Sequence, residues 1–247
     1  MTVSLQPLQV PSLKSACVTQ LEHLVLSGKL KINEKLPPER ELAAQLQVSR
    51  PIVHQAIVDL ASKGLVTIIP RQGTIVNDYR VTGSFALLSS LLTYHEGQLD
   101  PEFFTSLLDM RFVFEGEIAR CAALHRTDDN LEKLDQILKH EKQIEITAPL
   151  QRVDLDFNFH QQLALASGNL VYPLLLNSFK PVYTNLTAEF YTFAEQTAIC
   201  EVYAFHEQII EALKENNPVR SCDTMHKMLK HGADNLQKIK QDQSPSV

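Results

Sequence analysis

Several features are scarce in this 247-residue chain, and each absence narrows the class of protein to which the chain can belong. No apolar run approaches the length of a membrane span, so we expect no contact with a membrane. The first residues lack the basic and apolar regions of a signal peptide. The few cysteines are scattered and form no Cys-x-x-Cys pair, which favours a reduced, cytoplasmic setting: Cys17, Cys121, Cys200 and Cys222.

The net charge of −6 is unevenly distributed along the chain. Residues 1–78 carry eight Lys and Arg against six Asp and Glu, whereas residues 79–247 carry fifteen against twenty-three. We therefore predict two domains, 1–78 and 79–247. Because DNA affinity comes from local phosphate contacts, the acidic net charge of residues 79–247 does not exclude DNA binding. A net charge of only +2 on residues 1–78 suggests that one copy binds DNA poorly and that two copies of the chain act together.

Residues 37–62 carry the pattern of two short helices joined by a tight turn. Two prolines precede the first helix, and Glu39 and Glu41 favour its positive N-terminal end. Ser49 is a good N-cap for the second helix. The apolar positions of that helix recur at helical spacing: Ile52, Val53, Ala56, Ile57 and Leu60. The residues left facing outward are Ser49, Arg50, Pro51, His54 and Gln55.

A β-hairpin is predicted directly after these helices. Residues 66–69 are β-branched and read as a strand, which Pro70 stops. Gly73 permits a tight tip, and residues 74–76 return. A helix-turn-helix followed by such a hairpin is typical of units that place one helix in the DNA major groove. We expect Arg71, Gly73 and Thr74 to reach the DNA beside that helix.

These motifs together resemble the winged helix of GntR-family transcription regulators. The segments that carry the likeness, within residues 10–78, are LPPERELA at 36–43, VSR at 48–50, LASKGL at 60–65 and GTIV at 73–76. The resemblance implies that Arg40, Arg50 and the wing tip contact DNA. The family's usual Arg-Glu-Ala triplet is replaced by His54-Gln55-Ala56, so the usual operator does not carry over. Gln55 is able to read adenine through its amide.

Helical patterning continues almost to the end of the chain, with few glycines and no strand-like alternation. We predict an all-helical bundle with helices near 84–95, 101–125, 129–144, 148–166, 170–194, 197–215 and 218–241. This body resembles the effector domain of the FadR subfamily of GntR regulators. The likeness lies in three stretches: LLDMRFVFEGEIARCAA at 107–123, DFNFHQQLALASGN at 156–169 and HEQIIEAL at 206–213.

A metal site is one interpretation of the histidines in this body. Asp156 and His160 lie four residues apart, so a helix places them on one face, where they are able to hold a divalent metal. The resemblance adds His206 and one later histidine, and implies Zn, Ni or Mn. His231 is our fourth ligand, although gap-free counting places Met228 there, and a thioether binds these metals poorly. The alternative is a buried polar pair beside a core histidine.

Arg111 is the second candidate in the body, since the matching arginine of family members faces the effector cavity. A guanidinium there would clamp a carboxylate, although an ordinary helical ion pair with Glu115 explains it as well. We expect Tyr172 and Tyr183, from an aromatic-rich segment, to contribute to effector binding. Residues 166–184 resemble the fatty-acid-responsive family member, which senses acyl-coenzyme A without a metal.

The sequence therefore predicts a homodimeric transcription regulator of mainly α fold, an N-terminal winged helix-turn-helix followed by a helical effector bundle. It would bind double-stranded DNA at a palindromic operator and respond to a small molecule, either a carboxylate on a metal or an acyl thioester. A metal-dependent hydrolase is a rival of another class. It lacks a nucleophile motif and a general base at a telling spacing, so we expect no enzyme. A scaffold whose winged helix docks protein is the third alternative.

Overall fold

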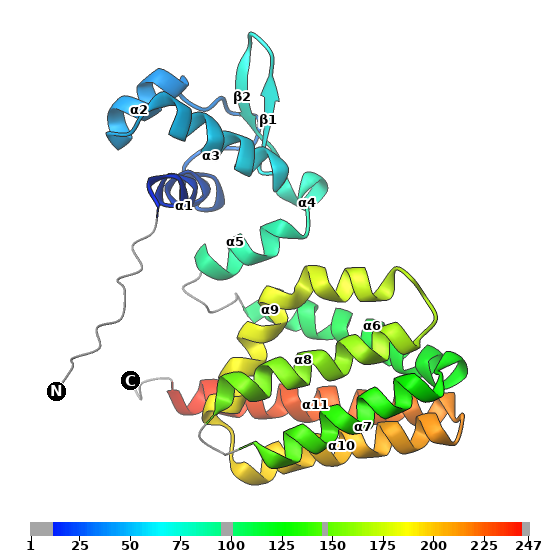
Figure 1. Cartoon of the computed structure of the whole chain (residues 1–247). Coiled ribbons are helices and arrows are strands. Elements are labelled where there is room, and N and C mark those ends of the chain that lie inside the picture. Colours follow the sequence, from blue (N-terminus) through cyan, green and yellow to red (C-terminus); the bar gives the residue numbers. More distant parts are fainter. Residues whose placement is uncertain (1–11, 95–100, 145–147, 244–247) are drawn as a thin grey trace, which may run out of the picture. The chain divides into compact units, whose positions relative to one another are not determined.

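The computed structural model describes residues 12–94, 101–144 and 148–243, which fall into two compact units, 1–98 and 99–247 (Figure 1). The elements of the first unit are α1 (Leu13–Leu26), α2 (Glu39–Leu46), α3 (Arg50–Ser62), β1 (Val66–Ile69), β2 (Gly73–Val76), α4 (Tyr79–Thr82) and α5 (Ala86–Tyr94). The elements of the second unit are α6 (Pro101–His125), α7 (Asp128–Gln143), α8 (Pro149–Ala166), α9 (Tyr172–Phe193), α10 (Gln196–Lys214) and α11 (Pro218–Gln243).

The core of the first unit lies between α1, α2 and α3. Leu42 on α2 is buried, and so is the stripe of α3 that the sequence predicted, with Ile52 half-buried at its edge. Gln47 ends α2 in the left-handed region at φ 53°, the conformation that turns the chain into α3. Ser49 then occupies the N-cap of α3. Because the apolar stripe of α3 packs in this core, the opposite edge of α3 faces away from the core.

The predicted hairpin is confirmed as a two-stranded antiparallel sheet. Val66 pairs with Val76 at its base, and Ile69 pairs with Gly73 at its tip. Gly73 has φ 110°, a conformation that other residues resist. The base is anchored because the buried side chains of Val66 and Val76 join the core. The tip therefore projects from a fixed base.

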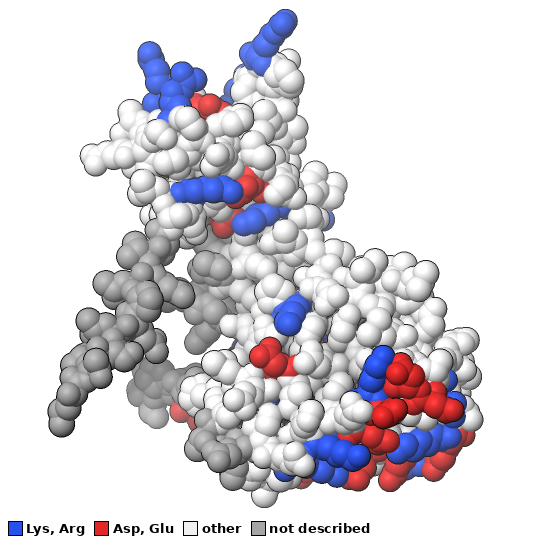
Figure 2. Space-filling model, viewed as in Figure 1, with Lys and Arg blue, Asp and Glu red and all other residues white. Residues whose placement is uncertain are grey.

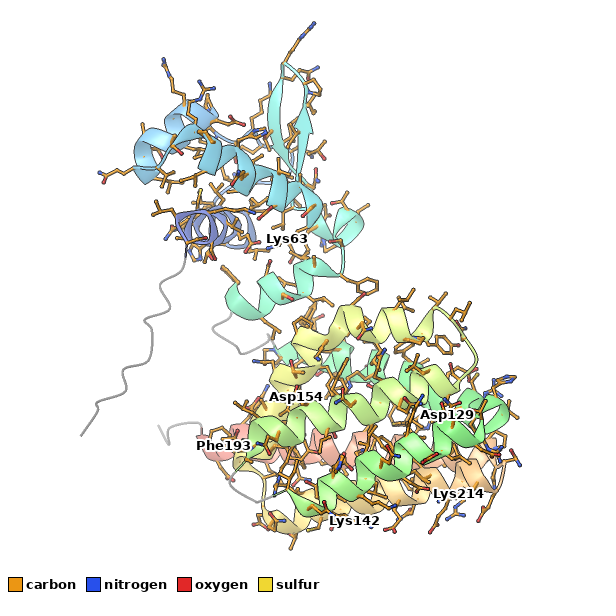
Figure 3. All side chains as sticks on the ribbon, viewed as in Figure 1. Lys63, Asp129, Lys142, Asp154, Phe193 and Lys214 are labelled. Atoms are coloured by element: carbon orange, nitrogen blue, oxygen red, sulfur yellow. The ribbon has the colours of Figure 1, made fainter. Side chains whose placement is uncertain are left out.

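Helices α4 and α5 belong to the first unit, and so its compact boundary lies at 98/99 rather than at the predicted 78/79. Gly64 has φ 80°, and a Cβ there would lie 2.0 Å from the Thr82 carbonyl oxygen on α4. Glu22 on α1 accepts hydrogen bonds from Lys63 at 2.6 Å and from Ser90 on α5 at 2.8 Å. Figure 3 labels Lys63 at this junction. These contacts attach both helices to the winged helix.

The second unit contains helices and connecting turns and no strand among its described residues, as predicted, and each helix lies within about three residues of its predicted bounds. Helix α11 packs along α6 and α10, and α8 packs along α9 and α7. Phe159, Leu163 and Ile118 fill the interior between them. Among the described residues, no helix is both long and apolar enough to cross a membrane.

Candidate functional site

An exposed polar edge runs along the start of α3. Every residue that the sequence placed there is exposed: Ser49, Arg50, Pro51, His54 and Gln55. At the N-terminus of α3, the Ser49 side chain makes no cap hydrogen bond among the described residues, so its hydroxyl remains available, whereas Ile52 already donates its N–H to the Ser49 carbonyl at 3.0 Å. Such a helix N-terminus attracts phosphate. Figure 2 shows Lys and Arg side chains at this end of the unit and at the hairpin tip.

The hairpin tip exposes only some of the residues that the sequence predicted to reach DNA. Arg71 and Gly73 are exposed, and Arg71 adopts φ 62° in the turn. No atom of the described part of the chain lies within 4 Å of the position that a Cβ on Gly73 would occupy, so the backbone can approach a ligand there. Thr74, in contrast, is buried, and its carbonyl accepts a hydrogen bond from the Leu36 backbone at 2.9 Å. This corrects the prediction that the Thr74 side chain faces DNA.

His54 has an acidic neighbour on the same face. Its Nδ1 lies 2.8 Å from Oε1 of Glu39, which begins α2. Arg40 follows on α2 and is exposed, as is Arg50. The carboxylate of Glu39 therefore offsets one of the positive charges that this face would present to phosphates.

A buried polar cluster occupies the interior of the second unit. Asp156 and His160 on α8 and His206 on α10 each offer one ligand atom within 4.8 Å of the others. All three side chains are buried, and His206 is completely enclosed. The structure thus brings together three of the four residues that the sequence proposed as metal ligands. One carboxylate with two imidazoles is a donor set that suits a divalent transition metal.

Each imidazole of the cluster has a buried glutamate beside its Nδ1. Nδ1 of His206 donates to Oε2 of Glu141 on α7 at 2.9 Å, and Nδ1 of His160 contacts Oε2 of Glu115 on α6. Nε2 of His206 has no hydrogen-bond partner among the described residues and lies 3.9 Å from Oδ1 of Asp156. A carboxylate on one ring nitrogen is the usual support for a histidine that binds metal through the other. The residues present therefore fit a metal.

Asp156 is held by two tyrosines of α9. Tyr183 donates to Oδ2 at 2.6 Å, and Tyr191 donates to Oδ1 at 2.9 Å. Burial and the Asp156 charge raise the pKa of both phenols well above the usual value, so they remain donors. Burial lowers the pKa of His206, but the nearby carboxylates of Glu141 and Asp156 outweigh it and raise that pKa overall.

Arg111 of α6 lies beside this cluster. Its Nε donates to Oε1 of Glu115 at 2.6 Å, and its guanidinium stacks 4.4 Å from the centre of the Tyr183 ring. The same Glu115 therefore links Arg111 to His160. A cavity of about 60 Å³ adjoins these groups, and its lining includes Arg111, Asp156, His160, Tyr183, Tyr191 and Met228. A small polar ligand there would meet a guanidinium, a carboxylate and an imidazole together.

Two family models match the chain and together span both units. Residues 13–76 match the model of bacterial regulatory proteins of the gntR family, and residues 77–246 match the FadR C-terminal domain. The chain is a GntR-family regulator. Its fold, winged helix and effector-binding C-terminal domain are those of the FadR type. The junction of the two models at 76/77 lies close to the domain boundary predicted from charge and composition.

Curated relatives agree with this assignment, and a solved structure shares the fold. The HTH-type transcriptional regulator LutR of Bacillus subtilis is 30% identical, over 78% of this chain and 87% of LutR. The fatty acid metabolism regulator protein of Klebsiella pneumoniae is 30% identical, over 72% and 77%. A solved structure of Lar, which controls the agr system of Listeria monocytogenes, shares the fold at a TM-score of 0.62 and 20% identity, covering 93% and 99%. The hydrolase alternative gains no support from these matches.

Two effector-domain residues of this GntR regulator lie elsewhere than predicted. Nε2 of His231 lies 2.9 Å from the Ala198 carbonyl, and Nδ1 lies 3.0 Å from Glu201, away from the cluster. Met228 lines the cavity instead, in agreement with gap-free counting. Tyr172 packs edge-on against Phe114 and is not among the residues lining the cavity. His231 and Tyr172 are therefore removed from the candidate site.

Sequence reasoning also missed residues that the fold brings to the cluster. Glu141 and Tyr191 come from α7 and α9, and neither shares a motif with the ligand it contacts. Arg152, one helical turn before Asp156, is buried, and its Nε and Nη1 find no partner among the described residues. The only available signal was spacing, because Arg152, Asp156 and His160 recur every four residues on α8.

Proposed function

We propose that this GntR regulator acts as a homodimer in which each winged helix reads half of a palindromic operator. The exposed edge of α3, with Arg50 at its start, carries the proposal, because it is the part of the unit free to enter a groove. Arg40 and Arg71 would hold phosphates on either side. Residues 1–78 have a net charge of only +2, so two heads binding together would supply the affinity that one lacks.

We propose further that the effector is a small carboxylate, held by a divalent metal and by Arg111. Asp156, His160 and His206 would bind the metal, which would be Zn, Ni or Mn. The buried glutamates at Nδ1 of the two imidazoles, Glu141 at His206 and Glu115 at His160, are the observation that supports this most directly. Three protein ligands leave a coordination position for the carboxylate, because the thioether of Met228 is a poor fourth ligand.

The size of the cavity favours this effector over an acyl thioester. A space of about 60 Å³ beside charged groups suits a few heavy atoms and not a long apolar chain. The bound carboxylate would accept from the Arg111 guanidinium, which Glu115 holds in place. The effector would alter DNA binding only through unequal affinity for the two states of the protein. The cluster would thus serve sensing and not catalysis.

Metal analysis and thermal shift test the effector proposal. The purified full chain should contain metal by mass spectrometry, and after chelation Zn, Ni or Mn should raise its melting temperature. His206→Ala should abolish both signals, whereas His231→Ala, outside the cluster, should retain them. Lactate, succinate and citrate then serve as carboxylate probes, and palmitoyl-coenzyme A as the rival. A melting shift with the acyl thioester alone, and none with metal, would overturn the proposal.

A further inference from the structure

The outer surface of α6 carries a self-complementary order of side chains. Val113, Glu117, Arg120 and Leu124 follow one another at spacings of four, three and four residues, so they form one stripe along the helix. Val113 is 73% exposed and Leu124 is 49% exposed, although both are large apolar side chains. Between them, Arg120 donates to both carboxylate oxygens of Glu117, each at 2.7 Å, on a half-exposed surface.

The order of side-chain types along the stripe is the same in both directions, except that the acidic and the basic residue exchange places. It runs apolar, acidic, basic, apolar, and its midpoint falls between Ile118 and Ala119. When two copies of α6 cross antiparallel about a two-fold axis at that midpoint, Val113 meets the partner subunit's Leu124. In the same register, Glu117 meets the partner subunit's Arg120. A two-fold interface requires this reciprocity, because the same patch is used on both subunits.

The elements that pack on α6 contact it beside the stripe and leave the stripe exposed. On one side, α11 packs along α6, and Ser221 donates to the Ala119 carbonyl at 2.9 Å. On the other side, the start of α9 packs through the edge-on contact of Tyr172 with Phe114. Leu170, just before α9, and Leu174 on α9 are also exposed apolar side chains. Large apolar side chains left exposed together on one surface are typical of an association surface.

We propose that the stripe Val113–Glu117–Arg120–Leu124 is the two-fold interface of the homodimer. This rests on the proposed function, which requires a dimer, and it names the surface and register. A second copy of the chain is the partner because the charge order complements itself. At the two-fold axis, Glu117 and Arg120 of both subunits form one cluster in which acidic and basic groups alternate. A pair of apolar side chains, Val113 and Leu124, lies at each end of this cluster. The intrachain ion pair thereby sets the register of the dimer.

Charge reversal across the axis tests this interface. Sedimentation velocity of the full chain at micromolar concentration should show a dimer for the wild type. Glu117→Arg places only arginines at the axis and Arg120→Glu only glutamates, so each single variant should weaken dimerisation at least tenfold. The double variant E117R/R120E restores alternating charges and should dimerise within a few-fold of wild type. Circular dichroism confirms that each variant retains its helices.

A matched control separates this surface from a general effect of charge. Lys133 and Asp129 form an exposed ion pair on α7 at 2.7 Å, so Lys133→Glu makes the same kind of change elsewhere and should leave the dimer intact. A wild-type monomer would refute the homodimer proposal itself. A wild-type dimer that survives both single reversals, or that the double variant fails to restore, would refute this interface and leave the homodimer standing.

Discussion

His206 donates from Nδ1 to Glu141 in the interior of the effector domain, at 2.9 Å and without access to solvent. The two residues are separated by 65 positions and come from α10 and α7. This hydrogen bond fixes which ring nitrogen faces Asp156, the orientation that the proposed metal would require. The pair therefore links the packing of two helices to the chemistry of the site.

Glu141→Gln should weaken metal binding by about 10–100-fold, because a neutral amide supports the imidazole less well. Competition with a chelator of known affinity measures the change. Glu201→Gln is the matched control, since Glu201 contacts His231 outside the cluster, and it should change metal affinity little. Equal losses in the two variants would show that the cluster does not hold the metal.

The stability of the effector domain should fall in acid through Glu115. Burial raises the pKa of this carboxyl, but the charges of Arg111 and His160 outweigh burial and lower it to about 2. A group whose pKa is lowered by folding stabilises the fold above its unfolded pKa, near 4.5, and loses that contribution as pH falls toward 2. The Glu115 contribution to stability should therefore disappear between those pH values.

Urea unfolding of Glu115→Gln across this range measures the contribution. The variant should be less stable than wild type at pH 7, and the difference should shrink as pH falls below 4.5. Glu132→Gln, at an exposed position of α7, should change stability little at any pH. A difference for Glu115→Gln that grows in acid would contradict the assigned ion pairs.

Glu39 should limit the DNA affinity of the winged helix. Its carboxylate contacts His54 on the face that would meet phosphates, so Glu39→Gln removes a repulsive charge and should tighten binding a few-fold at low salt. Fluorescence anisotropy with a labelled duplex selected from genomic DNA gives the affinity. Glu41→Gln alters the same helix, where Glu41 accepts from Gln45, and should have a smaller effect. No gain for Glu39→Gln would place that carboxylate outside the interface.

Gly64 should be intolerant of any side chain. A Cβ there would meet the Thr82 carbonyl at 2.0 Å, and φ is 80°, so Gly64→Ala should cost several kcal/mol, roughly the sum of left-handed strain and a clash. Gly28→Ala has a similar φ of 72° with open space around it, and should cost only about 1 kcal/mol. Denaturant unfolding compares the two. Equal costs would mean that α4 does not dock against the end of α3.

The winged helix could be predicted from sequence because its signals are local. Caps, prolines and apolar spacing defined α2 and α3, and Gly73 marked the hairpin tip. Thr74 was misplaced because strand alternation was not followed along β2: Thr74 and Val76 are both buried, whereas Gly73 is exposed. The docking of α4 depends on a close approach at Gly64, which no pattern in the sequence reports.

The polar cluster could be predicted only in part. Asp156 and His160 share a helix, so their spacing sufficed, and His206 came from the family resemblance. Glu141 required knowledge of how α7 packs against α10, which sequence patterns do not give. His231 was misplaced because gap-free counting, which pointed to Met228, was set aside. In the structure α10 ends at Lys214, α11 begins at Pro218, and His231 contacts Glu201 outside the cluster.

DNA binding by the exposed edge of α3 is the central claim, and anisotropy on a duplex selected from genomic DNA tests it most directly. Wild-type affinity should fall steeply with salt, and Arg50→Ala should weaken binding by at least tenfold with a shallower salt dependence. Lys14→Ala, whose ammonium pairs with Asp59 on the same unit, should bind as wild type. Salt-insensitive binding, or equal affinity of wild type and Arg50→Ala, would contradict the account.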